Sequence, residues 1–256
     1  MSVRTLSCVK RVPDTGASIV LTEDQRGIDT SGLGFTMSPH EECAIEEAVS
    51  QVETHEGSST VLTLGPSEAD EQLRTGLAMR ADDAVLLKTD ESEWDPMATG
   101  EAIAGAIEEL ESTEEPFDLL LFGNESADSE NYQVGIRVAH QLDLPCVTGI
   151  KELHLEDGVA VAHREIPTGT EIYEVPLPAV ITVKEGLNEP RYPSMRSKMQ
   201  ARRQEITTLE PTGTAGGPEM LRLITPEEDD APAEILGEGP DAARAIIDVF
   251  EELEVI

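Results

Sequence analysis

Short runs of apolar residues alternate with segments of helical periodicity over the first 147 residues of the chain. The runs predict strands at Val3–Val9 and at residues 60–64, 84–87 and 118–122, and residues 145–147 lead into another strand. The run at 118–122, DLLLF, has no polar alternation, which is typical of a parallel strand covered on both faces.

Helix signals separate these runs. The clearest is Ser38-Pro39-His40-Glu41, in which Ser caps the helix, Pro occupies the first helical position and Glu41 completes a capping box. The apolar stripe that follows extends this helix to about residue 55. Further helices are predicted after Gly65-Pro66-Ser67, after Asp95-Pro96 and over residues 132–142. This alternation predicts an α/β fold, a doubly wound and mostly parallel Rossmann-like sheet.

The pattern changes after residue 150. Asp157-Gly158 between two short apolar runs predicts a β-hairpin, and two more runs, residues 172–175 and Ala179–Val183, predict further strands of a β-rich addition. Beyond residue 205 the chain is rich in Gly, Pro and Glu up to a final amphipathic helix at residues 242–253. We therefore predict an α/β domain over 1–205 and an acidic, extended C-terminal arm over 206–256. Its helix is expected to dock on its own domain or on a partner subunit.

The chain is strongly acidic. Lys plus Arg is 18 and Asp plus Glu is 52, which gives a formal net charge of −34 over 256 residues. This charge argues against nucleic-acid binding through a basic surface, and an anionic membrane would repel the chain. Lys is scarce, and a carboxylate-rich surface favours a halophile's protein, because high salt screens the repulsion. A merely acidic protein from a low-salt organism is the alternative.

Several classes of chemistry have no support in the sequence. The 3 Cys and 5 His are scattered, which predicts neither a disulfide framework nor a metal site. No P-loop, no G-x-S-x-G motif and no activated nucleophile is visible, so bond chemistry by the chain alone is disfavoured. No apolar run approaches membrane-spanning length and the N-terminus lacks a signal-peptide pattern, so we expect a cytoplasmic protein without membrane insertion.

The most informative polar segment follows the fourth strand. It contains Gly123, Asn124, Glu125, Ser126, Ala127, Asp128, Gln133, Val134 and Gly135. Open α/β sheets bind ligands at the carboxyl ends of strands near the topological switch point, and a helix that opens there offers backbone N–H groups to a phosphate. With Cys8, Leu64 and the helix start at residues 38–41, the segment predicts a nucleotide crevice, whose phosphate contacts residues 133–135. An ordinary capped loop is the alternative.

A basic segment interrupts the acidic chain at residues 184–203. It holds six cationic residues against two acidic ones, a local charge of about +4, consisting of Lys184, Arg191, Arg196, Lys198, Arg202 and Arg203 against Glu185 and Glu189. Such a segment suggests steering toward an acidic partner surface. The alternative is a helix whose cations are neutralised by the chain's own carboxylates.

Four motifs resemble the β subunit of electron-transfer flavoproteins. They are VKRVPD at residues 9–14, Met37-Ser38-Pro39 with the following Glu46-Glu47-Ala48, RTGLAMRAD at 74–82, and LNEPRY at 187–192. The likeness extends in order over residues 3–205, so the chain is identified as a member of that family. Ser38 stands where the family usually has Asn.

The resemblance implies a heterodimer in which the α subunit holds the redox FAD near the interface. The β subunit would bind AMP, or a second FAD in bifurcating members, within residues 1–205. It would shuttle electrons from flavin dehydrogenases to a membrane quinone oxidoreductase or another electron-accepting oxidoreductase. Carried over by motif position, the nucleotide site comprises the loop at 123–135 with Cys8, Ser38, Pro39, His40, Glu41 and Leu64.

The resemblance also implies a docking site for the dehydrogenase. Met195 takes the position of an apolar anchor, and Arg191, Arg196 and Lys198 would surround it as a charged rim. Two other classes remain open from the residues alone. A nucleotide-sensing universal-stress-like protein would be shorter and would lack the basic segment. A nucleotide-dependent ligase or hydrolase would need a phosphate-gripping loop after the first strand, which VKRVPDTG does not provide.

Overall fold

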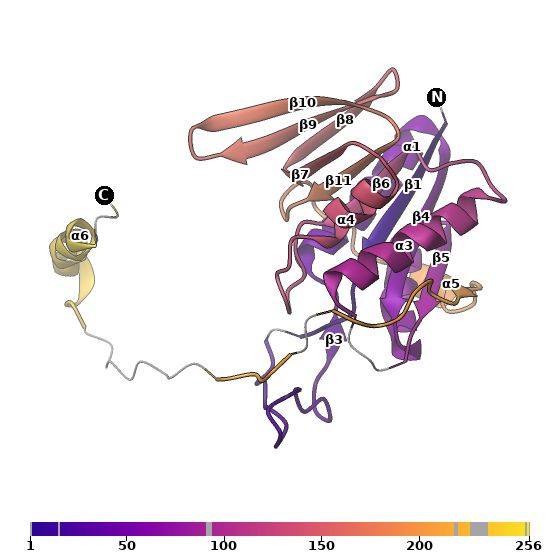
Figure 1. The fold of residues 1–256 in the computed structure, drawn as a ribbon. Helices are drawn as coiled ribbons and strands as arrows, with labels where there is room; N and C mark the ends of the chain where they lie inside the picture. The colour runs from indigo at the N-terminus through magenta and orange to yellow at the C-terminus, as the bar shows by residue number, and fades with distance from the viewer. Residues whose placement is uncertain are drawn as a thin grey trace.

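A parallel β-sheet forms the centre of the molecule (Figure 1). The computed structural model describes residues 2–14, 16–90, 94–217, 220–225, 235–253 and 255. The seven strands of the sheet are β1 (Val3–Val9), β4 (Gly57–Gly65), β5 (Asp83–Lys88), β6 (Leu119–Gly123), β7 (Cys146–Ile150), β11 (Ala179–Val183) and β12 (Thr207–Leu209). Their order is β12-β5-β4-β1-β6-β11-β7 and every neighbouring pair is parallel. The predicted doubly wound α/β fold is confirmed.

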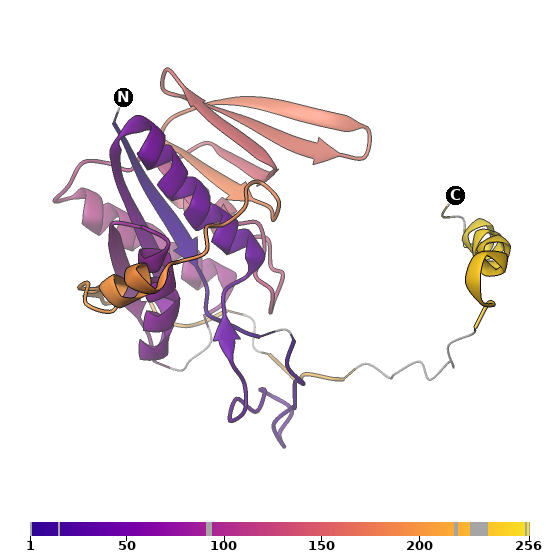
Figure 2. The ribbon, with the colours of Figure 1, turned by 180° about the vertical axis from the view of Figure 1, so that it is seen from behind.

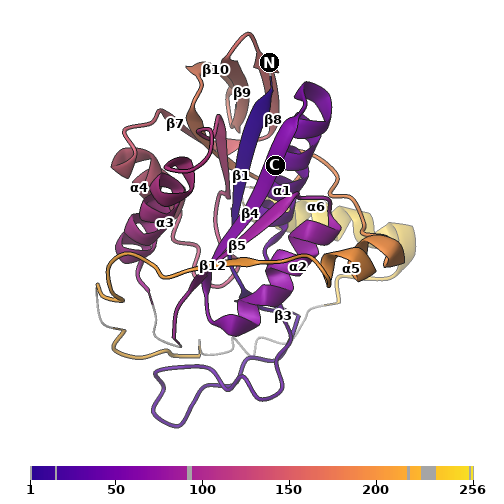
Figure 3. The ribbon, with the colours of Figure 1, turned by 90° about the vertical axis from the view of Figure 1, so that its right-hand side faces the viewer.

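Helices cover both faces of this sheet (Figure 3). One face carries α1 (Pro39–His55) and α2 (Asp70–Ala78), which follows the short 3₁₀ helix η1 (Ser67–Ala69); the other carries α3 (Pro96–Glu111) and α4 (Val134–Gln141). Apolar side chains of α1, such as Ala44 and Ile45, are fully buried against the strands, and Ile107 of α3 is fully buried on the opposite face. Burial on both faces explains the apolar runs of the sequence.

The predicted helix starts are confirmed with one exception. The Glu41 carboxylate accepts a hydrogen bond from the Ser38 N–H at 2.9 Å, and the Asp95 carboxylate accepts one from the Ala98 N–H at 2.8 Å. The prediction that a helix begins at Tyr132 is wrong, because α4 begins at Val134 and Tyr132 has a φ of 55°. A residue in that left-handed region cannot continue a right-handed helix.

A second, three-stranded antiparallel sheet is formed by β8 (Glu152–Glu156), β9 (Val159–Ile166) and β10 (Gly169–Pro176). Asp157 and Gly158, which join β8 to β9, have φ values of 48° and 81°. Positive φ at both central residues is the signature of a type I′ turn, so the hairpin prediction is confirmed. The assignment of residues 179–183 to the β-rich addition is wrong, because β11 lies between β6 and β7 of the central sheet.

The first residues beyond residue 205 belong to the central sheet. β12 pairs with β5 and forms one edge of the sheet, so the sheet extends past the boundary that the sequence suggested. Further on, η2 (Gly239–Asp241) leads into α6 (Ala242–Glu252), which stands apart from the α/β domain in Figures 1 and 2. No residue of α6 is buried, and its Ile246, Phe250 and the adjacent Leu253 are 40%, 43% and 66% exposed.

The remaining elements are small. β2 (Val12–Pro13) pairs with β3 (Phe35–Thr36), and α5 (Met195–Ala201) packs against α2. Within the described ranges, no helix has the length and apolar character needed to cross a membrane.

Candidate functional site

The topological switch point lies between β1 and β6. From β1 the chain continues to β4 and β5 on one side, whereas β6 lies on the other side of β1. The carboxyl ends of these parallel strands meet at one edge, where open α/β sheets bind ligands. The predicted Cys8 and Leu64 lie near the ends of β1 and β4, and Leu64 packs on the apolar cluster that contains Cys8 and Phe122.

Glu41 joins the first strand to the first helix. Its carboxylate accepts hydrogen bonds from the backbone N–H groups of Lys10 and Ser38, both at 2.9 Å. Gly123 permits this approach, since a Cβ there would lie 2.8 Å from Glu41 Cγ. Burial raises the pKa of Glu41 to about 8, although the two N–H donors and the Lys10 cation oppose the shift. Burial and the Glu41 charge also raise the pKa of the Cys8 thiol, so Cys8 is an apolar contact rather than a thiolate.

The loop after β6 folds over this junction. Lys10 Nζ lies 2.6 Å and 2.8 Å from the two carboxylate oxygens of Asp128, and Ser38 Oγ donates to the Glu125 carbonyl at 3.3 Å. Ser126 and Ala127 are half-buried within the loop. Lys10 is absent from the site predicted from the sequence, although it belongs to the VKRVPD motif. It follows the last residue of β1 directly, and its ammonium is ion-paired to the loop.

His40 connects three segments at the same edge. Its Nδ1 accepts a hydrogen bond from the Glu185 N–H at 2.7 Å, so the hydrogen resides on Nε2 in the neutral ring, and Nε2 lies 3.1 Å from Glu125 Oε1. The preceding Pro39 occupies the first position of α1 and is exposed. The His40 imidazole therefore links the start of α1, the loop after β6 and the segment after β11.

The N-terminus of α4 faces the same region and packs closely on the sheet. Asn124 accepts a hydrogen bond from Thr182 Oγ1 at 2.9 Å, which fixes the start of the loop. A Cβ at Gly135 would lie 2.9 Å from Thr182 Cγ2 and 3.2 Å from Phe122 Cγ. Val134 packs on the same apolar cluster, and Gln133 is exposed. Gly135 therefore serves helix-sheet packing, and replacing it would disturb the fold as well as any ligand.

A pocket of about 260 Å³ adjoins this loop. It lies beside β7 and β9 and is lined by Asn124, Tyr132, Ile136, Thr148, Gly149, Arg164, Glu165 and Lys184. The pocket is not predictable from the sequence, because four separate segments supply its lining. Two cations, Arg164 and Lys184, contribute to it in a chain of net charge −34.

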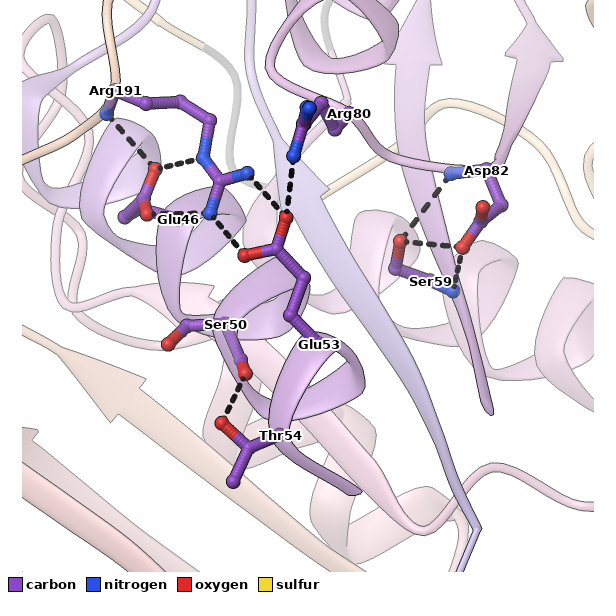
Figure 4. Close-up of polar contacts among 8 residues, drawn as sticks. All are labelled: Glu46, Ser50, Glu53, Thr54, Ser59, Arg80, Asp82 and Arg191. Carbon is purple, nitrogen blue, oxygen red and sulfur yellow. Dashed lines mark hydrogen bonds and ion pairs between the residues drawn. The ribbon is translucent and has the colours of Figure 1, made fainter. Parts of the chain in front are cut away.

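The basic segment divides into two environments. Met195, the first residue of α5, is 75% exposed, Arg196 is exposed, and Lys198 Nζ lies 4.8 Å from the centre of the Tyr192 ring. Arg191 was predicted to belong to a charged rim around Met195, and its guanidinium instead has partners within its own chain. Figure 4 shows its guanidinium between the carboxylates of Glu46 and Glu53 of α1, with N···O distances of 2.8–2.9 Å. Its charge is neutralised within the chain, as the alternative interpretation of this segment expects.

Metal chemistry finds no support in the geometry. Throughout the described part of the chain, no three His, Cys, Asp or Glu side chains gather in an arrangement that could hold a metal ion. The switch-point edge instead combines the start of α4, small side chains and Lys10, which is ion-paired to Asp128. A helix start beside a cation suits an anionic organic ligand.

Comparison with known proteins agrees with this architecture. The family model of the electron transfer flavoprotein domain matches residues 26–213. The electron transfer flavoprotein subunit beta of Megasphaera elsdenii is 33% identical over 262 aligned positions, covering 97% of each chain, and that of Bacillus subtilis is 36% identical over 204 positions, covering 79% of this chain and 77% of the relative. The caffeyl-CoA reductase-Etf complex subunit CarD of Acetobacterium woodii is 34% identical over 207 positions, covering 80% and 77%. The chain belongs to the electron transfer flavoprotein family as a β subunit.

Proposed function

We propose that this β subunit binds an adenine nucleotide at the β1–β6 switch point and carries out no bond chemistry by itself. Together with an α subunit that holds FAD, it would carry electrons from flavin dehydrogenases to a membrane quinone oxidoreductase or another acceptor. The supporting observation is the convergence of Lys10, the start of α1 and the loop at residues 123–135 on one sheet edge. We expect the protein to act in the cytoplasm.

The residues at this edge fit an adenylate group. The start of α4 offers N–H groups that lack partners within the helix, and about half a positive charge, to a phosphate. Lys10 is ion-paired to Asp128, so an incoming phosphate would compete with that carboxylate for the ammonium. Half-buried Ser126 and Ala127 keep the centre of the loop free of bulky side chains. AMP and a second FAD share this adenylate, and the nucleotide is one of the two.

The cationic pocket beside β7 fits the interface flavin. Lys184 would favour the negative charge that a reduced flavin acquires, and so would Arg164 to the extent that its ion pair with Glu171 leaves it charge. Tyr132 and Ile136 supply exposed apolar surface. When bound by the α subunit, FAD supplies the electron-accepting and electron-donating chemistry. The residues of this chain would contribute charge and shape to one side of it.

The amphipathic helix α6 fits the α subunit. Its Ile246 and Phe250 and the following Leu253 are exposed, and they form one apolar face four and three residues apart. An unpartnered apolar helix face is typical of a surface that a partner covers. We therefore propose that α6 contributes to the heterodimer interface.

We also propose that Met195, which is exposed at the start of α5, docks the dehydrogenase.

Co-expression with the α subunit tests the proposal. The purified heterodimer should show a flavin absorbance spectrum, whereas the β subunit alone should not. Extraction of the nucleotides should yield one FAD and one AMP per heterodimer, or two FAD molecules if the β site holds the second flavin. A heterodimer with one FAD and no second adenine nucleotide would overturn the switch-point site, and one without flavin would overturn the carrier assignment.

A further inference from the structure

Three exposed apolar side chains lie on the segment between Arg191 and Ala201. Tyr192, Met195 and Met199 within it are 89%, 75% and 55% exposed. These three side chains do little to hold the segment in place, and ordering it on binding would cost affinity. Besides the packing of α5 on α2, contacts at the two ends of the segment supply the order.

Arg191 fixes the first end. Its Nε and Nη2 bond Glu46, its Nη1 and Nη2 bond Glu53, and its backbone N–H donates to Glu46 Oε2 at 2.9 Å. Glu46 is only 9% exposed, so the bonds to this carboxylate are shielded from water, whereas the Glu53 side chain is 45% exposed. Asn188 adds two bonds to α1 through its Nδ2, at 3.1 Å from the Cys43 carbonyl and from Glu47 Oε2.

Arg74 fixes the second end. Its Nη1 donates to the carbonyls of Ala201 at 2.6 Å and Gln204 at 3.3 Å, while Asp70 holds the guanidinium from α2 at 2.7 Å and 3.2 Å. Ala201 itself is 1% exposed. The exposed segment is thus fixed at one end by Arg191, which bonds two carboxylates of α1, and at the other end by Arg74 of α2.

We propose that Arg191 is a positioning residue that holds residues 192–200, and Met195 in particular, ready for the dehydrogenase. This inference rests on the docking role proposed above for Met195. Arg191 is not a steering charge, because two carboxylates of its own chain neutralise it. Its function depends on the planar fork of the guanidinium, which bonds both carboxylates at once and which a lysine ammonium cannot reproduce.

Three variants of the full heterodimer separate positioning from charge. Arg191→Ala removes the fork and the charge, Arg191→Lys keeps the charge, and Arg80→Ala is the matched control. Arg80 is exposed and bonds the same Glu53 Oε1 at 3.0 Å. In Figure 4 its drawn bond goes to Glu53 and not to residues 192–200. Each heterodimer is first checked for wild-type flavin content.

Hydrogen exchange and electron transfer provide the two readouts. In both Arg191→Ala and Arg191→Lys, amide exchange of peptides covering residues 187–200 should become at least about tenfold faster. The second readout uses a flavin dehydrogenase that reduces the wild-type heterodimer. Its half-saturating concentration should rise about tenfold in both variants, with an unchanged rate at saturation. Arg80→Ala should change neither quantity. Adding Met195→Ala to Arg191→Ala should raise the half-saturating concentration by less than the product of the single effects.

Each contrary result is informative. Unchanged exchange in Arg191→Ala, or wild-type behaviour of Arg191→Lys in both readouts, would overturn the positioning role. Faster exchange with an unchanged half-saturating concentration would show that the order does not serve docking, which also overturns it. Wild-type transfer by Met195→Ala alone would instead contradict the docking role of Met195, and the exchange data would still report on the Arg191 contacts.

Discussion

The Glu41 carboxylate accepts a hydrogen bond from the Lys10 N–H at 2.9 Å and so ties the end of β1 to the first turn of α1. A second bond from the Ser38 N–H, also at 2.9 Å, closes the junction. This buried carboxylate lies where the strands meet the candidate nucleotide site. Its protonation therefore couples the pH to the stability of that edge of the sheet.

The Glu41 contribution to stability should decrease as the pH rises. The folded-state pKa of about 8 exceeds the ordinary value of 4.5, so between these values the folded chain retains a proton that the unfolded chain has released. The stabilisation is therefore complete below about pH 4.5 and is lost as the pH rises through 8. Urea unfolding of wild type and Glu41→Gln from about pH 5 to about pH 9 at constant salt measures it. The free energy of unfolding of wild type minus that of Glu41→Gln should fall as the pH rises over this range.

Glu53→Gln is the control for this measurement. Hydrogen bonds from Arg191, and then from Arg80, lower the pKa of Glu53 to about 2. Its stabilisation is present above the ordinary value of 4.5 and is lost only as the pH falls toward 2. The same difference for Glu53→Gln should therefore be flat over the measured range. A flat difference for Glu41→Gln as well would contradict the pKa assignment.

Salt should stabilise the protein strongly. The chain has 52 carboxylates and 18 Lys and Arg residues, and counterions screen the resulting repulsion. The melting temperature should rise steadily as KCl increases from about 0.1 M to about 3 M. Sucrose of equal osmolality is the control, because it does not screen charge. A melting temperature that is independent of KCl would remove the halophile interpretation.

Met195 and Arg196 should affect dehydrogenase docking in different ways. Met195→Ala should weaken docking by roughly 1–2 kcal/mol, as expected for an apolar side chain that becomes buried, with little salt dependence. Arg196→Glu should lower the association rate at low salt and have little effect at molar salt. Stopped-flow flavin absorbance measures both. Met97→Ala, on α3 and 50% exposed, is the control, and a wild-type rate in Met195→Ala would contradict the anchor role.

Nucleotide retention should depend on the small residues of the loop after β6. Ala127→Glu places a carboxylate in the half-buried centre of that loop, where it would repel a phosphate. We expect the purified heterodimer to lose most of its second adenine nucleotide while keeping the α-bound FAD. Gln141→Glu adds the same charge at the exposed far end of α4 and should retain both. Full nucleotide content in Ala127→Glu would place the site elsewhere.

The apolar face of α6 should contribute to heterodimer affinity. Phe250→Ala removes a side chain that is 43% exposed in the isolated chain and should raise the dissociation constant of the heterodimer about tenfold. Glu251→Ala changes the neighbouring exposed position and should have little effect. Sedimentation of the mixed subunits gives both constants. Equal affinities would show that the α subunit does not cover this face.

Local sequence signals determined most of the individual elements. Ser38-Pro39 and Asp95-Pro96 start helices because the caps satisfy backbone donors and proline loses no hydrogen bond at the first turn. Asp157-Gly158 forms its turn because both residues tolerate positive φ. These signals depend only on a few consecutive residues, which is why the strands, the hairpin and the parallel α/β class follow from the sequence.

Tertiary structure alone decided which elements meet. The apolar run of β11 is compatible with any fully buried strand, and only the fold places it between β6 and β7. Likewise, the charge of Arg191 is evident in the sequence, but the sequence does not show whether it faces a partner or Glu46 and Glu53. That choice depends on tertiary packing, because Glu53 and Glu46 precede Arg191 by 138 and 145 positions. Apolar burial and ion pairing carry no information about sequence distance, so such long-range pairings emerge only when the whole chain has folded.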